Sequence, residues 1–175
     1  MSGVPAYVRN GRGDILAANQ FCRALDSPMF DTTRRPVNTA RFTFLDPRAP
    51  DFFIEWNQVA NLIVASLRSE AGRDPYDPAL TDLVGELSTQ SHQFRTRWAQ
   101  HDVRFHDTSV KRFHHPVVGD LELSYDVMQL TSDQGLTIAA YAAEPGSASE
   151  QGLKLLGSWA ATAHADQTVN ATDRT

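Results

Sequence analysis

Four of the six histidines lie between residues 101 and 115, the residue type and spacing that most invites a metal-site hypothesis. They are His101, His106, His114 and His115. Structural zinc sites combine histidines with cysteine pairs, and many zinc proteases carry an H-E-x-x-H helix, but neither pattern accompanies these residues. Alternation along a strand would also send His114 and His115 to opposite faces. The sequence therefore predicts no metal ion and no haem.

Cys22 is the single cysteine, and it could act as a nucleophile only if a distant histidine approached it. It falls in a predicted apolar helix, where a small buried thiol is ordinary. The chain has no G-x-S-x-G elbow, and the glycines of N-G-R-G-D lack the spacing of a phosphate-binding loop. We therefore expect no catalytic residues, no cofactor and no enzyme activity. A lone cysteine also suits a reducing cytoplasm.

Large apolar side chains could instead form a pocket for a hydrophobic ligand. Such pockets are concave and mostly apolar, with a few polar groups that orient the guest. The candidate wall residues are Phe42, Phe44, Phe53, Trp56, Val59, Ile63 and Trp98 on the helical side, and Leu123, Tyr125, Met128 and Tyr141 on the strands. The alternative is a filled core, because large apolar residues at helical or strand spacing usually lie in protein interiors.

The elements that must position these side chains begin with two short strands around an Asn-Gly turn at residues 10–11. This dipeptide tolerates positive φ and suits a hairpin. Asn19 follows as a good N-cap for a short helix. Residues 27–50 mix Pro, Thr, Asp and Arg, so we expect short helices and loops there.

Two long helices are predicted next from their apolar stripes. The first is opened by Pro50 and Asp51 and closed by Gly72, and its stripe consists of Phe52, Trp56, Val59, Ile63 and Leu67. The second starts at Asp77, followed by a proline at the first helical position, and its stripe consists of Leu80, Leu83, Val84, Leu87, Ser91, Phe94 and Trp98. The short connection favours an antiparallel helical hairpin.

Beyond residue 100 the apolar residues alternate, as they do in strands with one buried face. The pattern covers Val103 and Phe105, residues 110–114, residues 121–126 and residues 136–143. Strands in series with short turns form an antiparallel meander. The complete pattern predicts an α+β fold, with two early and three late strands in a five-stranded antiparallel sheet and a helical insert between them.

A closing helix is expected over residues 147–163, with a loose tail over residues 164–175. The 175 residues suit one domain, with 41% hydrophobic and 21% charged residues. The formal charge of -5 argues against contact with a phosphate backbone, which needs clustered Lys and Arg. No apolar run approaches membrane-spanning length. We expect a soluble cytoplasmic protein that contacts neither membrane nor, by itself, DNA.

Several linked blocks in one order resemble a known family. They are VPAYVRNGRGDILAAN, NTARFTFLDPRA, RSEAGRDPYDPALTDLVGELS, SHQFRTRWAQHDVRF, KRFHHP, VGDLELSY and YAAEPGSAS. Together they resemble the C-terminal ligand-binding domain of MmyB-like bacterial transcription regulators. The resemblance implies a PAS-like sensor domain over residues 4–163. In that family a helix-turn-helix module of the XRE type normally precedes the sensor, and residues 1–10 hold none.

The same resemblance implies a hydrophobic small-molecule ligand of the fatty-acid class. Burying about a dozen methylenes at about 0.8 kcal/mol each would contribute about 10 kcal/mol before the costs of ordering. An acid headgroup would need a cation or hydrogen-bond donors, and the candidates are Arg95, Arg41 and His115. A structural ion pair is the alternative for the arginines, and a hydrogen-bonded turn residue is the alternative for the histidine.

Three functions remain open from the residues alone. The first is an effector-binding sensor, which needs only a ligand whose affinity differs between two arrangements of the protein. The second is a small enzyme with a buried general base at the floor of its pocket. The third is a structural dimerisation module with a filled core. By analogy with regulators that read symmetric operators, we also expect a homodimer.

Overall fold

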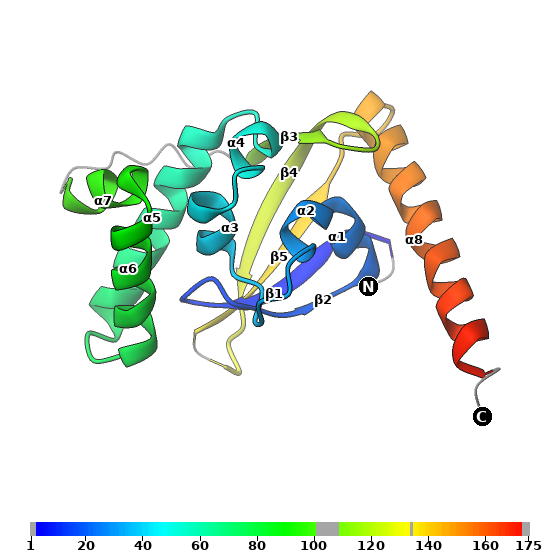
Figure 1. Cartoon of the computed structure of the whole chain (residues 1–175). Coiled ribbons are helices and arrows are strands. Elements are labelled where there is room, and N and C mark those ends of the chain that lie inside the picture. The colour runs from blue at the N-terminus through cyan, green and yellow to red at the C-terminus, as the bar shows by residue number, and fades with distance from the viewer. Residues whose placement is uncertain (1–2, 101–108, 134, 173–175) are drawn as a thin grey trace.

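The computed structural model describes residues 3–100, 109–133 and 135–172, with side chains up to residue 162. Its centre is a five-stranded antiparallel sheet in the order β2-β1-β5-β4-β3 (Figure 1). The strands are β1 (Ala6–Asn10), β2 (Ile15–Ala18), β3 (Val110–His115), β4 (Gly119–Gln129) and β5 (Leu136–Ala142). The α+β prediction and the late meander are confirmed. The expected strand around Val103 and Phe105 lies outside the described residues.

Helices occupy the segment between the early and late strands, as predicted, and one more follows the sheet. They are α1 (Gln20–Leu25), α2 (Ser27–Phe30), α3 (Thr39–Leu45), α4 (Ala49–Phe52), α5 (Trp56–Arg73), α6 (Pro78–Gln90), α7 (His92–Ala99) and α8 (Ala148–Thr172). Figure 1 shows α5, α6 and α7 grouped to one side of the sheet and α8 on the other side. Helix α3 lies between the first group and the strands.

The helix starts predicted from capping residues are confirmed. The Asn19 side chain accepts a hydrogen bond from the backbone N–H of Cys22 at 2.8 Å and caps α1. The Asp77 side chain accepts from the backbone N–H groups of the first turn of α6, and Pro78 occupies the first helical position. These side chains satisfy backbone donors that have no partner inside a helix.

Both long helices were predicted as continuous, and both predictions are wrong in the same way. After α4 the backbone extends at Phe53, which forms an isolated bridge with Phe113 of β3, and α5 begins only at Trp56. The second helix breaks at Ser91, whose side chain accepts from the N–H of Phe94 and caps α7. Each break changes the direction of the chain while the apolar stripe continues, so the stripe alone could not reveal it.

The C-terminal helix begins close to the predicted position, because α8 starts at Ala148. It continues to Thr172, through most of the segment for which a loose tail was expected. Its first half packs on the body of the domain: Leu153 and Leu156 are buried against the sheet core.

Two apolar clusters hold the helices on the sheet. The larger one joins α1, α4 and α8 to inward-facing strand residues such as Phe113, Leu121 and Leu123. The smaller one joins α5, α6 and α7 around Phe94 and Leu87. Ile63 of α5 packs against both clusters. A cavity lies where the two clusters meet, and Ile63 is part of its lining.

Candidate functional site

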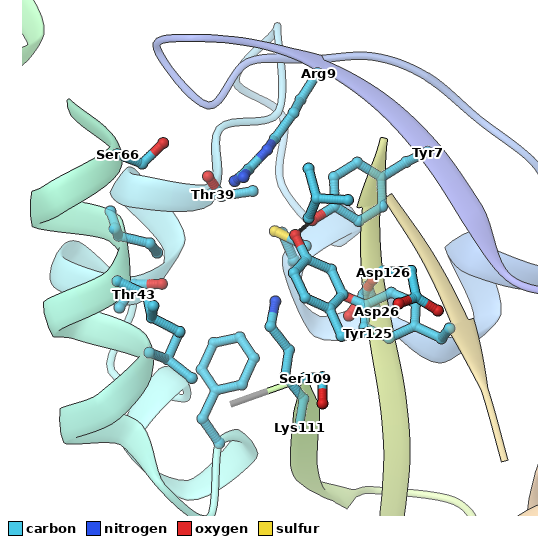
Figure 2. A pocket seen from close by; sticks show the side chains of 17 residues that line it. Tyr7, Arg9, Asp26, Thr39, Thr43, Ser66, Ser109, Lys111, Tyr125 and Asp126 are labelled. Carbon is cyan, nitrogen blue, oxygen red and sulfur yellow. Dashed lines mark hydrogen bonds between the residues drawn. The ribbon is translucent and has the colours of Figure 1, made fainter. Parts of the chain in front are cut away.

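A cavity of about 470 Å³ lies between the inward face of the sheet and the helices α3 and α5 (Figure 2). This volume falls in the range typical of small-molecule sites. The helical wall is mainly apolar with three hydroxyl side chains, and the sheet wall carries the charged groups and the tyrosines. The space is therefore suited to a ligand with an apolar part and a polar part.

The helical wall follows from the spacing of four residues on one face of α5. Val59, Leu62, Ile63 and Ser66 stand at positions i, i+3, i+4 and i+7, so their side chains point to the same side of the helix. Phe53 extends this wall from the break between α4 and α5. Thr39 and Thr43 add hydroxyl groups one helical turn apart on α3.

The sheet wall follows from strand alternation. Tyr7 and Arg9 alternate on β1, and Tyr125 and Val127 alternate on β4, so all four share the inward face. In the register of the sheet Tyr125 lies opposite Tyr141 of β5. Lys111 of β3 lies opposite Leu123 and belongs to the same face, where its ammonium group enters the cavity.

A pair of tyrosines forms the centre of the polar side. The hydroxyl oxygens of Tyr7 and Tyr125 are hydrogen-bonded at 3.1 Å, and the Lys111 ammonium lies 3.5 Å from the centre of the Tyr125 ring. Burial alone would raise the pKa of Tyr125, but the charges of Lys111 and Arg9 outweigh it and lower that pKa. Burial and the neighbouring Tyr125 raise the pKa of Tyr7. One tyrosine donates to the other, which leaves one O–H for a further acceptor.

Arg9 and Lys111 are cations with no salt bridge among the described residues. Burial alone would lower the pKa of Arg9, but its interactions with Tyr125, Tyr7 and Tyr141 raise it, so the guanidinium keeps its charge. Sequence reasoning missed both residues. A signal was present, because alternation with Tyr7 and with Phe113 places a charge on the buried face of each strand.

Two further polar groups of the lining lack hydrogen-bond partners in the described structure. The Oδ1 atom of Asp26 and the Oγ1 atom of Thr43 are both buried and unpaired. Asp26 ends α1, and its Oδ2 atom accepts from the Cys22 thiol at 3.5 Å. Burial raises the pKa of Asp26 to about 6, against smaller opposing effects of Lys111 and Cys22.

Five of the residues predicted as pocket walls line this cavity together. They are Phe53, Val59, Ile63, Tyr125 and Tyr141. Three of them come from the helical side and two from the strands, so the predicted contact between a helical wall and a sheet wall is present.

The other predicted wall residues lie elsewhere because they pack on neighbouring helices or fill the core. The Phe44 ring lies 5.1 Å from that of Phe94 and 6.0 Å from that of Trp56. The Trp56 indole N–H donates to the Thr43 carbonyl at 2.9 Å, and Trp98 stacks on Phe94. Outside the cavity lining are Phe42, Phe44, Trp56, Trp98, Leu123 and Met128.

Met128 shows why the strand side was partly misread. It follows Val127 and pairs with Ile138, so it belongs to the outward face and is 44% exposed. Leu123 has the inward orientation but is completely buried among core side chains. Phe42 packs edge-on against Phe52 and Phe53 at 5.8 Å in each case.

The three headgroup candidates also lie outside the cavity lining, each with a protein partner. The Arg95 guanidinium donates to the Ser88 carbonyl at 2.9 Å, and Arg41 pairs with Glu86 at 2.9 Å. The buried His115 ring makes a hydrogen bond from Nε2 to the Ala24 carbonyl at 3.0 Å. Burial lowers the pKa of His115. Arg41 and His115 therefore have the partners that were the alternatives to ligand binding, whereas Arg95 is held by a backbone carbonyl and not by an ion pair.

No group of three or more His, Cys, Asp or Glu side chains that could hold a metal ion occurs in the part of the chain that the structure describes. His101 and His106 lie outside that part. Among the described helices, none combines the length and apolar character needed to cross a membrane.

Comparison with known families decides the class of this site. The family model described as the MmyB-like transcription regulator ligand binding domain matches residues 1–156. The chain belongs to this family. The match includes every residue of the cavity lining, so the cavity lies within the ligand-binding domain of a transcription regulator. No curated protein matches the chain.

Proposed function

We propose that this domain senses a hydrophobic, fatty-acid-like small molecule, which binds in the cavity between α5 and the sheet. The observation that carries the proposal is the four-residue apolar and small-residue face of α5 turned toward the strands across about 470 Å³. A filled core, the alternative for a purely structural module, would leave no such space. Apolar surface buried at about 25 cal/mol per Å² supplies affinity without many polar contacts.

Sensing requires that the ligand favours one arrangement of the protein over another. In this site a ligand contacts α5 on one side and β1, β3 and β4 on the other, so it can bias how the helical group is held against the sheet. We propose that this bias reaches a helix-turn-helix module of the XRE type outside this chain. We also propose that two copies pair in the cytoplasm to read a symmetric operator.

The test uses a matched pair of substitutions on α5. Ser66 lines the cavity, whereas Ser69 is exposed on the same helix. Ser66→Phe places a ring in the ligand space and is expected to weaken binding of dodecanoic acid at least about tenfold, while Ser69→Phe leaves it unchanged. Binding is measured by calorimetry, and native mass spectrometry with lipid extraction identifies any molecule that copurifies.

Stability data give a second measurement for the same pair. A ligand at 100 times its Kd stabilises a folded protein by about 2.7 kcal/mol, so dodecanoic acid should raise the Tm of the wild type and of Ser69→Phe but not of Ser66→Phe. Equal binding by both variants would show that the ligand enters elsewhere and would contradict the proposal.

A further inference from the structure

We infer that Arg9 and Lys111 form a carboxylate site at the polar end of the cavity, so that the domain selects aliphatic acids over uncharged amphiphiles of the same length. This inference rests on the proposed function and specifies its ligand. It replaces the headgroup positions Arg95, Arg41 and His115 expected from the sequence, each of which has a protein partner.

Arg9 and Lys111 point into the cavity from two different strands. Figure 2 shows the Arg9 side chain entering from β1 and the Lys111 side chain entering from β3 on the opposite side. Their charged ends approach the same region, beside the hydroxyl groups of Tyr7 and Tyr125. A carboxylate placed there could accept hydrogen bonds from the guanidinium, the ammonium and the remaining tyrosine O–H.

Arg9 differs from most other arginines of the described chain, because neither a salt bridge nor a side-chain hydrogen bond within that part holds its guanidinium. Arg35, Arg68, Arg95 and Arg97 each donate a hydrogen bond to the protein. Salt bridges are formed by Arg12, Arg34, Arg41, Arg48, Arg73 and Arg112. Arg9 is half-buried, and its charge interactions are with three tyrosines rather than with a carboxylate. A cation removed from water is costly unless it is paired, so an anionic ligand would supply what the protein does not.

Two aspartates of the lining, Asp26 and Asp126, would repel a bound carboxylate if their negative charges lay close to it. Asp126 alternates with the inward-facing Tyr125 and Val127, and it is exposed on the other side of β4. Asp26 is completely buried and interacts electrostatically with Lys111, but forms no salt bridge with it. Asp26 also acts on both tyrosines, where its charge favours a raised pKa. Arg9 forms no salt bridge with either acid, so two positive charges face the one buried carboxylate, and the net charge at the tyrosine pair favours an anion.

The apolar wall of the cavity is placed to hold the aliphatic chain of such a ligand. Val59 and Ile63 line the cavity from α5, and Phe53 lines it from the break between α4 and α5. A molecule whose acid group lies at Arg9 and Lys111 can therefore extend its aliphatic chain along these side chains. An uncharged amphiphile would gain the same apolar contacts but would leave both cations without a salt bridge.

The test compares dodecanoate with dodecan-1-ol, which have the same chain length and differ in the headgroup. Wild-type protein is expected to bind dodecanoate at least about tenfold more tightly. Arg9→Met and Lys111→Met remove the charges while keeping similar side-chain length, and each should weaken dodecanoate binding about 10- to 100-fold while leaving the affinity for dodecan-1-ol nearly unchanged. Arg95→Met is the matched control and should change neither affinity.

The alcohol also reports whether each variant is folded, because an intact cavity still binds it. Charge-retaining Arg9→Lys should keep most of the preference for the acid. Equal affinities of wild-type protein for the acid and the alcohol would overturn the carboxylate site while leaving the hydrophobic sensor standing. Binding of neither compound by folded wild-type protein would overturn the proposed function itself.

Discussion

Asp26 has a different chemical environment from the paired acids of the described surface. It is completely buried, its Oδ1 atom has no hydrogen-bond partner among the described residues, and burial raises its pKa from 3.8 to about 6. By contrast Asp46 makes a salt bridge with Arg48, and its side-chain hydrogen bonds with Arg48 lower its pKa. Asp26 therefore opposes folding at neutral pH, whereas paired carboxylates support it.

Replacing Asp26 with asparagine should change how stability depends on pH. Below about pH 4 the carboxyl is protonated in both the folded and unfolded chain, and no difference arises. Between pH 4 and 6 the unfolded chain loses the proton first, so the wild type loses up to about 3 kcal/mol at about 1.4 kcal/mol per pH unit. Asp26→Asn lacks this loss, so its stability relative to wild type should rise from pH 4 to 7.

Urea unfolding at a series of pH values measures this difference directly. The shared contributions of the other acids cancel between the two proteins, because only residue 26 differs. Parallel curves for wild type and Asp26→Asn would contradict the assignment of a raised pKa to this carboxyl.

At the residue scale, sequence reasoning identified the apolar half of the cavity better than the polar half. Val59 and Ile63 were accessible because helical spacing marks a shared face. Arg9 and Lys111 were missed because a charged residue in a strand is normally assigned to the solvent side. Their inward position depends on pairing register, which brings Lys111 opposite Leu123 and Arg9 opposite Thr137.

At the scale of elements, α8 packs unusually close to the sheet at Gly152. A Cβ atom built there would lie 2.7 Å from the Cδ2 atom of Leu121, which is buried in the core. Gly85 in α6 is exposed, and a Cβ atom there would meet no described atom within 4 Å. Alanine is favoured over glycine in both helices, but only position 85 has space for the added methyl group.

Alanine substitutions at these glycines should have opposite effects. Gly85→Ala should stabilise the protein by about 0.5–1 kcal/mol, because glycine disfavours a helix interior. Gly152→Ala gains the same helix preference but overpacks the core at a cost of about 1–3 kcal/mol, so a net loss of up to about 2 kcal/mol is expected. Denaturant unfolding checks both, and equal stabilisation by the two would mean that α8 is not seated this closely on β4.

Element boundaries were predictable where a side chain caps the backbone and unpredictable where packing interrupts a helix. Asn19 and Asp77 cap their helices as expected. The extended backbone at Phe53 depends on its bridge to Phe113, which is distant in sequence, and no local pattern encodes it. Ser91 carried a local signal as an N-cap type, but its position in the apolar stripe concealed it.

At the scale of the whole molecule, the net charge of -5 bears on the proposed division between ligand sensing and DNA binding. An acidic domain is unsuited to neutralise phosphates, so DNA contact would come from another module. The five-stranded sheet with its helical insert was predictable at this scale, because periodicity reports element type. A pocket between helices and sheet was also predicted, but its size was not, since the size depends on how α5 and the sheet are spaced.

The proposed pairing of two copies predicts a dimer in solution. Sedimentation equilibrium of this chain should give a mass near twice 19.4 kDa at micromolar concentration. Sedimentation at the mass of one chain across that range would contradict pairing through the sensor domain. The measurement should be repeated with dodecanoic acid, since a sensed ligand can change the association constant.

The position of β1 between β2 and β5 has a consequence for synthesis on the ribosome. Ala6 of β1 lies opposite Ala140 of β5. Of the five strands β1 is synthesised first and β5 last, so this pair can form only after the other strands have been made. Until then the nascent chain exposes one edge of β1, and such edges invite association with other chains. A chaperone that shields this edge should therefore increase the yield of protein released in native form.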